Sequence, residues 1–349
     1  MRRPRRPRRP HSMKAALDAR RAEQFRRAFE GEIASLRGLY RKASSDMMQV
    51  LADAAATPLT RARSISHLRQ YNTILANLGD EAAAWMQLNL PESYKAGVAF
   101  SDGSIGDLRR AGINVRRRQR DVFTQVHREA VAAIVQEMQR TTDFALAQIG
   151  RRSKGVFRRV GIEEVAKGIA EGKTRVEVTR GIKERLLAEG KPVFKDRLGR
   201  EWDLDRYSEM VARTTSREAA TQGTMNRLRE HGLQLAQVSA HGAADFCVYY
   251  ENVVVCIEGE HPVYPPISAI NGGPPFHPNC VHVLTPFVEN LATDEEKAAG
   301  KIEPELLDKS PAQLQRQFRK DFPERARAEG KRVRQEAALI SGRAKRRAQ

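Results

Sequence analysis

The residues with the most distinctive chemistry lie close together in the last third of the sequence. All three cysteines and four of the eight histidines fall within residues 241–282. Thiolate sulfur and imidazole nitrogen are the ligands that zinc prefers, and a structural zinc site takes four of them in a tetrahedron. The clustering therefore predicts a structural zinc site, with zinc as the expected cofactor.

The spacing of these residues ranks them as ligands. Cys280 and His282 stand two residues apart, so their side chains point to the same side of an extended strand. Pro278 stiffens the turn that would bring His277 towards them. From strongest to weakest, the candidate ligands are Cys247, His277 and Cys280, then His282 or His241 as the fourth ligand, and finally Cys256 and His261.

A second interpretation of the same residues stays open. The C-x-x-C pair of a standard zinc finger is absent, because Tyr250 stands three residues after Cys247. The cysteines can instead be buried core thiols, with the histidines hydrogen-bonded to backbone. The Pro- and Gly-rich loop at 264–278 buries few side chains and needs a cross-link to hold one conformation, which favours the metal site.

The sequence offers little support for catalysis. A catalytic zinc needs an open coordination position and a base, for which Asp245, Glu251 and Glu258 are candidates by sequence distance alone. The sequence contains no HExxH, P-loop or GxGxxG motif, and no activating pattern surrounds Cys247 or Cys280. We therefore expect a protein that is not an enzyme and has no small-molecule substrate.

Positive charge is concentrated at the two ends of the sequence. The 349 residues include 61 Lys and Arg against 43 Asp and Glu, a net charge of +18. Residues 1–12 hold six Arg and no acid, and residues 331–349 hold seven basic residues against Glu336. We expect these ends to contact nucleic-acid phosphates without recognising a base sequence. Two alternatives stay open for residues 1–12: they form a tail without a specific partner, or the protein starts at Met13. The residues assigned to this contact are Arg2, Arg3, Arg5, Arg6, Arg8, Arg9, Arg343, Lys345, Arg346 and Arg347.

Proline divides the chain into a helical part and a part of different pattern. None occurs between Pro91 and Pro192, whereas seven of the sixteen lie within residues 262–286. Before Pro192, apolar residues recur at three- to four-residue spacing, which predicts helices. The expected elements are helices at 14–54, 60–90 and 121–149, a loop at 102–106, and a hairpin of short helices at 162–171 and 175–187.

After Pro192 the pattern becomes mixed. Alternating residues around Leu198 and Gly199 predict a β-hairpin, and residues 205–231 predict a helix that ends at Gly232. Short strands are expected at 235–239, 252–257 and 281–284, followed by a solvated helical tail beyond residue 290. The predicted fold class is α+β, with a predominantly helical N-terminal two-thirds and a small β-containing C-terminal module. The predicted domains are a disordered basic arm at 1–12, a helical domain at 13–190, a module at 191–290 and a charged helical or disordered tail at 291–349.

Membrane insertion and secretion are not expected. No apolar run approaches the roughly 18 to 20 residues of a membrane span. The basic start is not followed by the apolar segment of a signal peptide. Three cysteines are too few for a disulfide scaffold and fit a reducing compartment.

Four segments carry a resemblance to a known family. They are YSEMVARTT at 207–215, VSAHG at 238–242, DFC at 245–247 and GPPFHPNCVH at 273–282. Together they resemble the minor capsid, or head morphogenesis, proteins of tailed bacteriophages, especially the phage minor capsid protein 2 group, related to Mu-type and SPP1-type head proteins. Many members have a second cysteine and an arginine where this chain has Tyr250 and Val281, so the resemblance does not imply a four-thiolate site.

The resemblance implies a structural and assembly role in the head of a phage or prophage particle. It implies a low-copy virion protein at the capsid interior or portal vertex, present in host cytoplasm during assembly. The expected partners are portal and major capsid proteins, bound by the helical domain, and packaged DNA, bound by the basic termini. Two alternatives stay open: a non-catalytic nucleic-acid-binding protein with a zinc-stapled module, and a zinc-dependent hydrolase or nuclease.

Overall fold

The fold is α+β, as predicted, and divides into two compact units that share two helices. The computed structural model describes residues 27, 29–56, 61–116, 124–171, 173–196, 199–277 and 280–331. The helical unit comprises Ala28–Tyr94 and Phe123–Ala219. The C-terminal unit comprises Met1–Arg27, Lys95–Val122 and Ala220–Gln349. Each unit therefore combines segments far apart in sequence, and the linear domain boundaries expected from the sequence stay a prediction.

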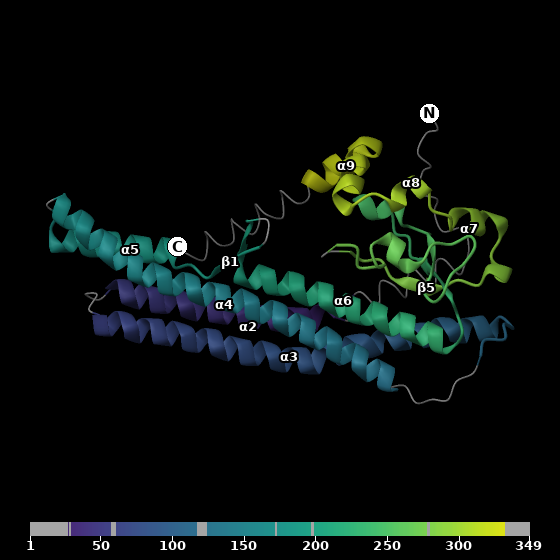
Figure 1. Ribbon diagram of the computed structural model, residues 1–349, viewed down its shortest axis with the longest axis horizontal. Coiled ribbons are helices and arrows are strands. Elements are labelled where there is room, and N and C mark those ends of the chain that lie inside the picture. Colours follow the sequence, from purple (N-terminus) through teal and green to yellow (C-terminus); the bar gives the residue numbers. More distant parts are fainter. Residues whose placement is uncertain are drawn as a thin grey trace. The chain divides into compact units, whose positions relative to one another are not determined.

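Long helices make up most of the helical unit (Figure 1). They are α2 (Glu30–Ala56), the first part of α3 (Arg61–Arg110), α4 (Gln125–Ala170), α5 (Arg175–Glu189) and the first part of α6 (Leu204–Glu230). In α2, Ile33, Leu36, Tyr40 and Met47 are buried at three- to seven-residue intervals, so one face of the helix is apolar.

Specific contacts join these helices along their length. Trp85 Nε1 on α3 donates to Glu32 O on α2 at 3.0 Å. Tyr94 at the end of this part of α3 lies 2.7 Å, hydroxyl to Nδ1, from His127 on α4. Helix α5 packs on both α2 and α4, and Thr174 begins it with a capping box. The helical unit is thus a set of packed helices, as the apolar spacing predicts.

Predicted boundaries within α3 and α4 are wrong: the helices expected at 60–90 and 121–149 continue to Arg110 and Ala170. The expected loop at 102–106 lies inside α3, and the expected short helix at 162–171 is the end of α4. Tertiary packing explains the first error: Ser101 and Ser104 are buried, and Ser101 Oγ donates to Thr224 O on α6 at 3.2 Å. Glycine's poor helix propensity costs only about 1 kcal/mol, which such packing outweighs.

The predicted β-hairpin is confirmed. Strands β1 (Val193–Lys195) and β2 (Glu201–Asp203) are antiparallel, with Phe194 opposite Trp202. Asp196 closes the turn by accepting hydrogen bonds from Arg200 N and from Trp202 Nε1, each at 3.0 Å. Gly199 has a φ of 76°, a left-handed conformation that glycine adopts without a steric penalty.

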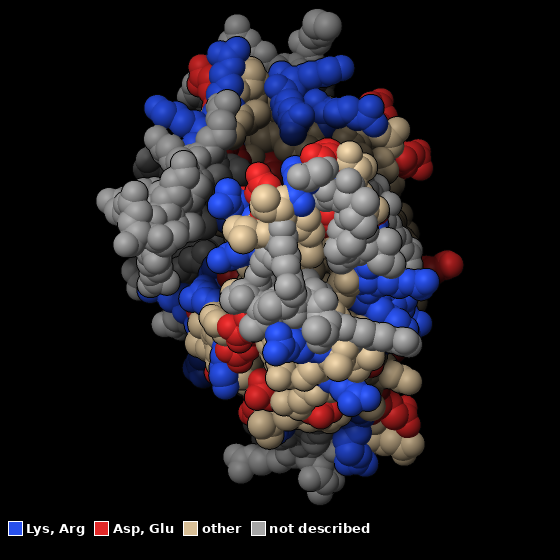
Figure 2. Space-filling model, turned by 90° about the vertical axis from the view of Figure 1, so that its left-hand side faces the viewer, with Lys and Arg blue, Asp and Glu red and all other residues tan. Residues whose placement is uncertain are grey.

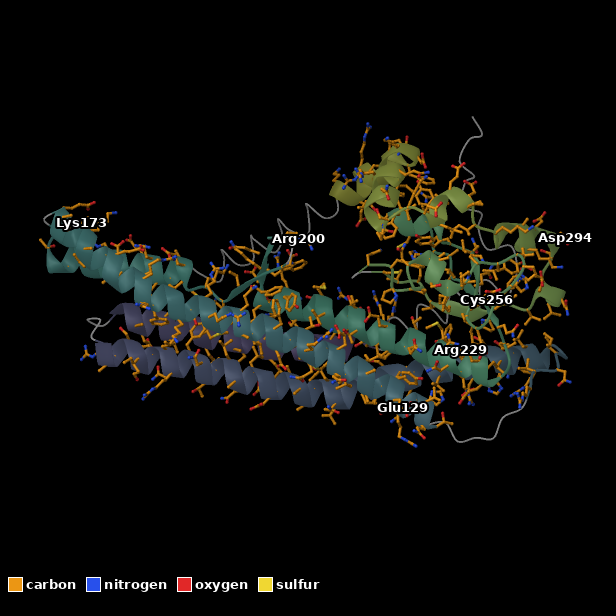
Figure 3. All side chains as sticks on the ribbon, in the orientation of Figure 1. Glu129, Lys173, Arg200, Arg229, Cys256 and Asp294 are labelled. Atoms are coloured by element: carbon orange, nitrogen blue, oxygen red, sulfur yellow. The ribbon has the colours of Figure 1, made fainter. Side chains whose placement is uncertain are left out.

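A small antiparallel sheet organises the C-terminal unit, in the order β4 (Val254–Cys256), β3 (Leu235–Val238), β5 (Leu284–Pro286). It follows α6, which ends before Gly232 (φ 71°) as predicted. The third strand begins three residues later than expected, directly after Val283, which is joined to Ser239 by Ser239 N donating to Val283 O at 2.9 Å and Val283 N donating to Ser239 Oγ at 3.0 Å. Arg229 on α6 donates to Ile257 O, which ties the helix to the end of β4 (Figure 3 labels Arg229 and Cys256).

The segment after residue 290 is helical but not wholly solvated, so that expectation is corrected. Besides the 3-10 helix η3 (Glu289–Leu291), it contains α7 (Asp294–Ala299), α8 (Pro304–Leu307) and α9 (Pro311–Asp321). Leu306, Leu314 and Phe318 from this segment are buried in the same core as Cys247 and Cys280. Among the described residues, no helix is both long and apolar enough to span a membrane.

Candidate metal centre

Cys247 is positioned by a short 3-10 helix, η1 (Phe246–Tyr249). Asp245 caps this helix, because its Oδ1 accepts a hydrogen bond from Cys247 N at 2.9 Å. The Cys247 side chain is fully buried. The Asp-x-Cys pattern is therefore a local capping signal that fixes the backbone of the first candidate ligand.

His277 and Cys280 come from the loop that leads into β5. Cys280 N donates to His277 O at 2.9 Å, and the two residues between them lie outside the described residues. His277 Nε2 lies 3.0 Å from Asp245 Oδ2. The carboxylate that caps η1 thus also orients this imidazole.

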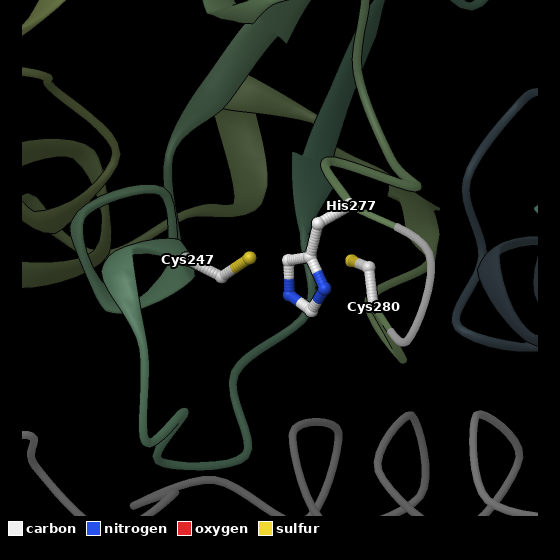
Figure 4. A group of neighbouring side chains, drawn as sticks. All are labelled: Cys247, His277 and Cys280. Carbon is white, nitrogen blue, oxygen red and sulfur yellow. The ribbon is translucent and has the colours of Figure 1, made fainter. Parts of the chain in front are cut away.

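Cys247, His277 and Cys280 converge although up to 33 residues separate them. One donor atom from each lies within 4.8 Å of the others. Figure 4 shows the imidazole between the two thiol side chains, with both sulfur atoms turned towards it. The three strongest candidate ligands are therefore brought together, while metal binding itself stays a prediction.

The two candidates for the fourth ligand belong to a neighbouring group. His241, Glu251 and His282 also place one donor atom each within 4.8 Å of the others. Glu251 Oε1 accepts hydrogen bonds from His241 N and Ala243 N at 3.0 and 2.8 Å, and lies 3.4 Å from His282 Nε2. The His241 and His282 rings are 4.3 Å apart.

His282 connects the two groups. Its Nδ1 lies 3.4 Å from Cys280 Sγ, while its Nε2 faces Glu251. Its side chain is almost completely buried, whereas 39% of the His241 side chain is exposed. Of the two histidines, His282 is therefore the one that faces the thiol pair.

The electrostatics of the site favour negative charge on the Cys280 side. The hydrogen bond with the Cys247 thiol, together with His282, lowers the pKa of Cys280 to about 4. The same bond with Cys280, together with burial, raises the pKa of Cys247. Burial opposes charge on His282, but its contacts with Cys280 and Glu251 outweigh burial and raise its pKa to about 9. Burial likewise opposes charge on Asp245, yet the hydrogen bond with His277 lowers its pKa to about 2.

The two weaker candidate ligands lie elsewhere in the fold. Cys256 is buried in β4, and its Sγ donates to Glu258 O at 3.0 Å. His261 stacks on Tyr264, and its Nδ1 accepts from Val263 N at 3.2 Å. Neither belongs to either group of potential ligands among the described residues.

The carboxylates at the site have structural partners. Sequence reasoning named Asp245 and Glu251 only as candidate bases, yet each supports an imidazole and accepts at least one backbone N–H. Glu258 lies on the surface, and its carbonyl oxygen accepts from Cys256. The site has the composition of a metal centre with supporting carboxylates, the arrangement that orients metal-binding histidines.

The residues assigned to nucleic-acid contact cannot be placed in the fold. All ten lie outside the described residues: Arg2, Arg3, Arg5, Arg6, Arg8, Arg9, Arg343, Lys345, Arg346 and Arg347.

Basic residues within the helices have acidic neighbours. Arg159 pairs with Glu189, and Arg152 Nη1 lies 3.5 Å from Glu201 Oε1. Figure 2 shows Lys and Arg interspersed with Asp and Glu on one face of the molecule. Mixed charges of this kind are typical of a solvated surface.

Comparison with known proteins gives one result. The family described as phage minor capsid protein 2 matches residues 27–346, nearly the whole chain. Searches of the curated proteins and of the solved structures give no match.

Proposed function

Because the chain belongs to the phage minor capsid protein 2 family, we propose that it is a low-copy protein of a tailed-phage head that acts in head assembly at the portal. Family membership makes it a structural protein of the phage particle, with other head proteins as partners. The observation that carries the proposal is the family match over residues 27–346, which includes both compact units. A structural capsid family also supports a role without catalysis.

The helical unit is the proposed docking region for portal and major capsid proteins. Leu88 on α3, Phe144 on α4 and Val176 on α5 are each more than half exposed. Large exposed apolar side chains are candidate contacts, although single ones also occur on ordinary surfaces. Co-sedimentation of the full chain with assembled heads tests the proposal, with L88D, F144D and V176D each expected to reduce association. Undiminished association of the triple variant would contradict this docking region.

The basic termini are the proposed contact with packaged DNA. Each carries a net charge of +6, whereas the remaining 318 residues together carry only +6. Phosphate contacts release counterions, so binding should weaken steeply as salt rises.

A charge-neutralised variant tests the DNA contact. Replacing the six N-terminal arginines by glutamine should flatten the slope of log K against log salt by up to about 5. The matched control replaces six exposed arginines of the helical unit and should change the slope less; these are Arg63, Arg69, Arg140, Arg151, Arg158 and Arg180. Equal slopes for the two variants would refute contact through the N-terminal arm. Salt-sensitive DNA binding without association with heads would favour a free nucleic-acid-binding protein instead.

A further inference from the structure

We propose that the C-terminal unit binds one structural zinc ion through Cys247, His277, Cys280 and His282, with Asp245 and Glu251 holding the two imidazoles. The proposal is independent of the role in head assembly. It rests on donor chemistry, on the second hydrogen bond of each histidine, and on the position of His282.

The donor set matches zinc. Two buried sulfur atoms and an imidazole nitrogen lie within 4.8 Å of one another. Magnesium and calcium take oxygen ligands, whereas thiolate and imidazole together select zinc among the common divalent ions.

Each of the two imidazoles is supported by a carboxylate. His277 Nε2 lies 3.0 Å from Asp245 Oδ2, and His282 Nε2 lies 3.4 Å from Glu251 Oε1. In both rings Nδ1 is thus the nitrogen that would bind the metal. Metal-binding histidines almost always use their second nitrogen in this way, since the contact fixes the ring and its tautomer.

The position of His282 makes it the fourth ligand. Its Nδ1 lies 3.4 Å from Cys280 Sγ. Two ligands of a tetrahedral zinc, one sulfur and one nitrogen, lie about 3.5 Å apart for ordinary bond lengths. The His241 ring is tilted by 42° against the His282 ring and is more exposed to solvent. The structure groups His282 with His241 and Glu251 and places it next to Cys280, so the His282 ring would have to move towards Cys247 and His277 to close the tetrahedron.

The chain around the site has little regular secondary structure, and a bound metal would stabilise it. Between β4 and β5 the described residues contain one short 3-10 helix, η2 (Ile267–Ile270), and many turns. A metal bound by Cys247, which precedes β4, and by residues near the end of this region would fix η1 against the loop that precedes β5.

Metal content of the full chain is the first test. We expect about one zinc per chain by mass spectrometry after purification in reducing, chelator-free buffer. Less than about 0.2 zinc per chain, or a disulfide between Cys247 and Cys280 in protein kept reduced, would overturn the proposal.

Variants test the ligand assignment. C247S and C280S should each lower zinc content at least about tenfold, while the matched control C256S, a buried cysteine of the same unit, should retain it. H282A should weaken zinc binding more than H241A, and D245N should weaken it about 10- to 100-fold. Loss of zinc from C256S equal to that from C280S would contradict the site, and a larger loss from H241A than from H282A would contradict the fourth ligand.

Cobalt substitution keeps the test valid if a variant fails to fold. Cobalt added to metal-free wild-type chain should give the visible absorption bands of a tetrahedral site with thiolate ligands, saturating at about one equivalent. Their absence in folded wild-type protein would overturn the proposal.

Discussion

Leu36 in α2 and Phe318 in α9 are both fully buried, but their surroundings differ in construction. Leu36 belongs to a helix of 27 residues with an apolar face that runs along its length. Phe318 belongs to a helix of 11 residues that packs on η1, within a unit whose strands have only three or four residues.

The contrast shows two ways of stabilising a chain. The helical unit relies on repeated apolar contacts along elements that satisfy their own backbone groups. The C-terminal unit relies on contacts between distant segments and on polar side chains that bond loop backbone, such as Gln315 Oε1 accepting from Phe246 N at 3.1 Å. A substitution in the helical unit should therefore destabilise only the neighbouring helices, whereas one in the C-terminal unit should destabilise several of its segments.

The largest effect is expected from Phe318→Ala. Truncating a buried aromatic side chain costs about 3–5 kcal/mol. Because α9 supports η1, hydrogen exchange should accelerate in β3, β4 and β5 while α2 stays protected. Equal acceleration in α2 would break the distinction between the two units.

Leu36→Ala is the counterpart in the helical unit. The expected loss of stability is about 2–5 kcal/mol, from lost transfer energy and the cavity left behind. Hydrogen exchange should accelerate in α2 and in its neighbour α5, with the sheet of the C-terminal unit unchanged. Loss of sheet protection would show that the units unfold together.

Gly97→Ala tests the crossing of α3 and α6 within the C-terminal unit. An added Cβ would overlap the carbonyl oxygen of Ala220, so we expect about 1–3 kcal/mol of destabilisation in chemical denaturation. The matched control is Gly103→Ala in the same helix, where nothing lies within 4 Å. This control should stabilise the helix by roughly 0.5–1 kcal/mol, and equal effects of the two changes would contradict the close crossing.

The smallest effect should be the same in both units. Thr174 begins α5 and Ser310 begins α9, each with a capping box. Alanine at either position should cost about 1 kcal/mol in chemical denaturation, because each change removes the hydroxyl that accepts from a backbone N–H of the first turn and donates to the side chain of the same residue. The exposed Thr73, which bonds only its own helix, is the control and should change stability by less than about 0.5 kcal/mol. A much larger loss of stability from the change at Ser310 would mean that α9 stabilises its unit by more than the contribution of its cap.

The helices were largely predictable because their apolar spacing is local. The hairpin at Gly199 and the end of α6 at Gly232 were predictable for the same reason, since a left-handed residue there is a local requirement. The continuation of α3 through Gly103 was not, because buried contacts of Ser101 with α6 decide it. The burial of Phe318 was missed in the same way: its partners lie far away in sequence.

The sequence indicated which thiols and imidazoles lie together at the candidate site, but not the carboxylates that support the imidazoles. The clustering and spacing of the few thiols and imidazoles indicated Cys247, His277 and Cys280 as the strongest candidate ligands. Asp245 and Glu251 act through hydrogen bonds to histidines 32 and 31 residues away, and no spacing rule encodes such pairs. The Asp-x-Cys cap was the one local signal that could have identified Asp245.

The convergence of Cys247 and Cys280 has a topological consequence. A metal ion bound by both would close a loop of about 34 residues, and the chain-entropy model for cross-links gives such a closure about 3–4 kcal/mol. A disulfide would restrict the chain similarly, but it opens under reducing conditions, whereas a zinc clip does not depend on an oxidising environment. The closed segment contains β4 and the loop before β5, so the clip would add its restriction to the packing that already holds this strand in the sheet.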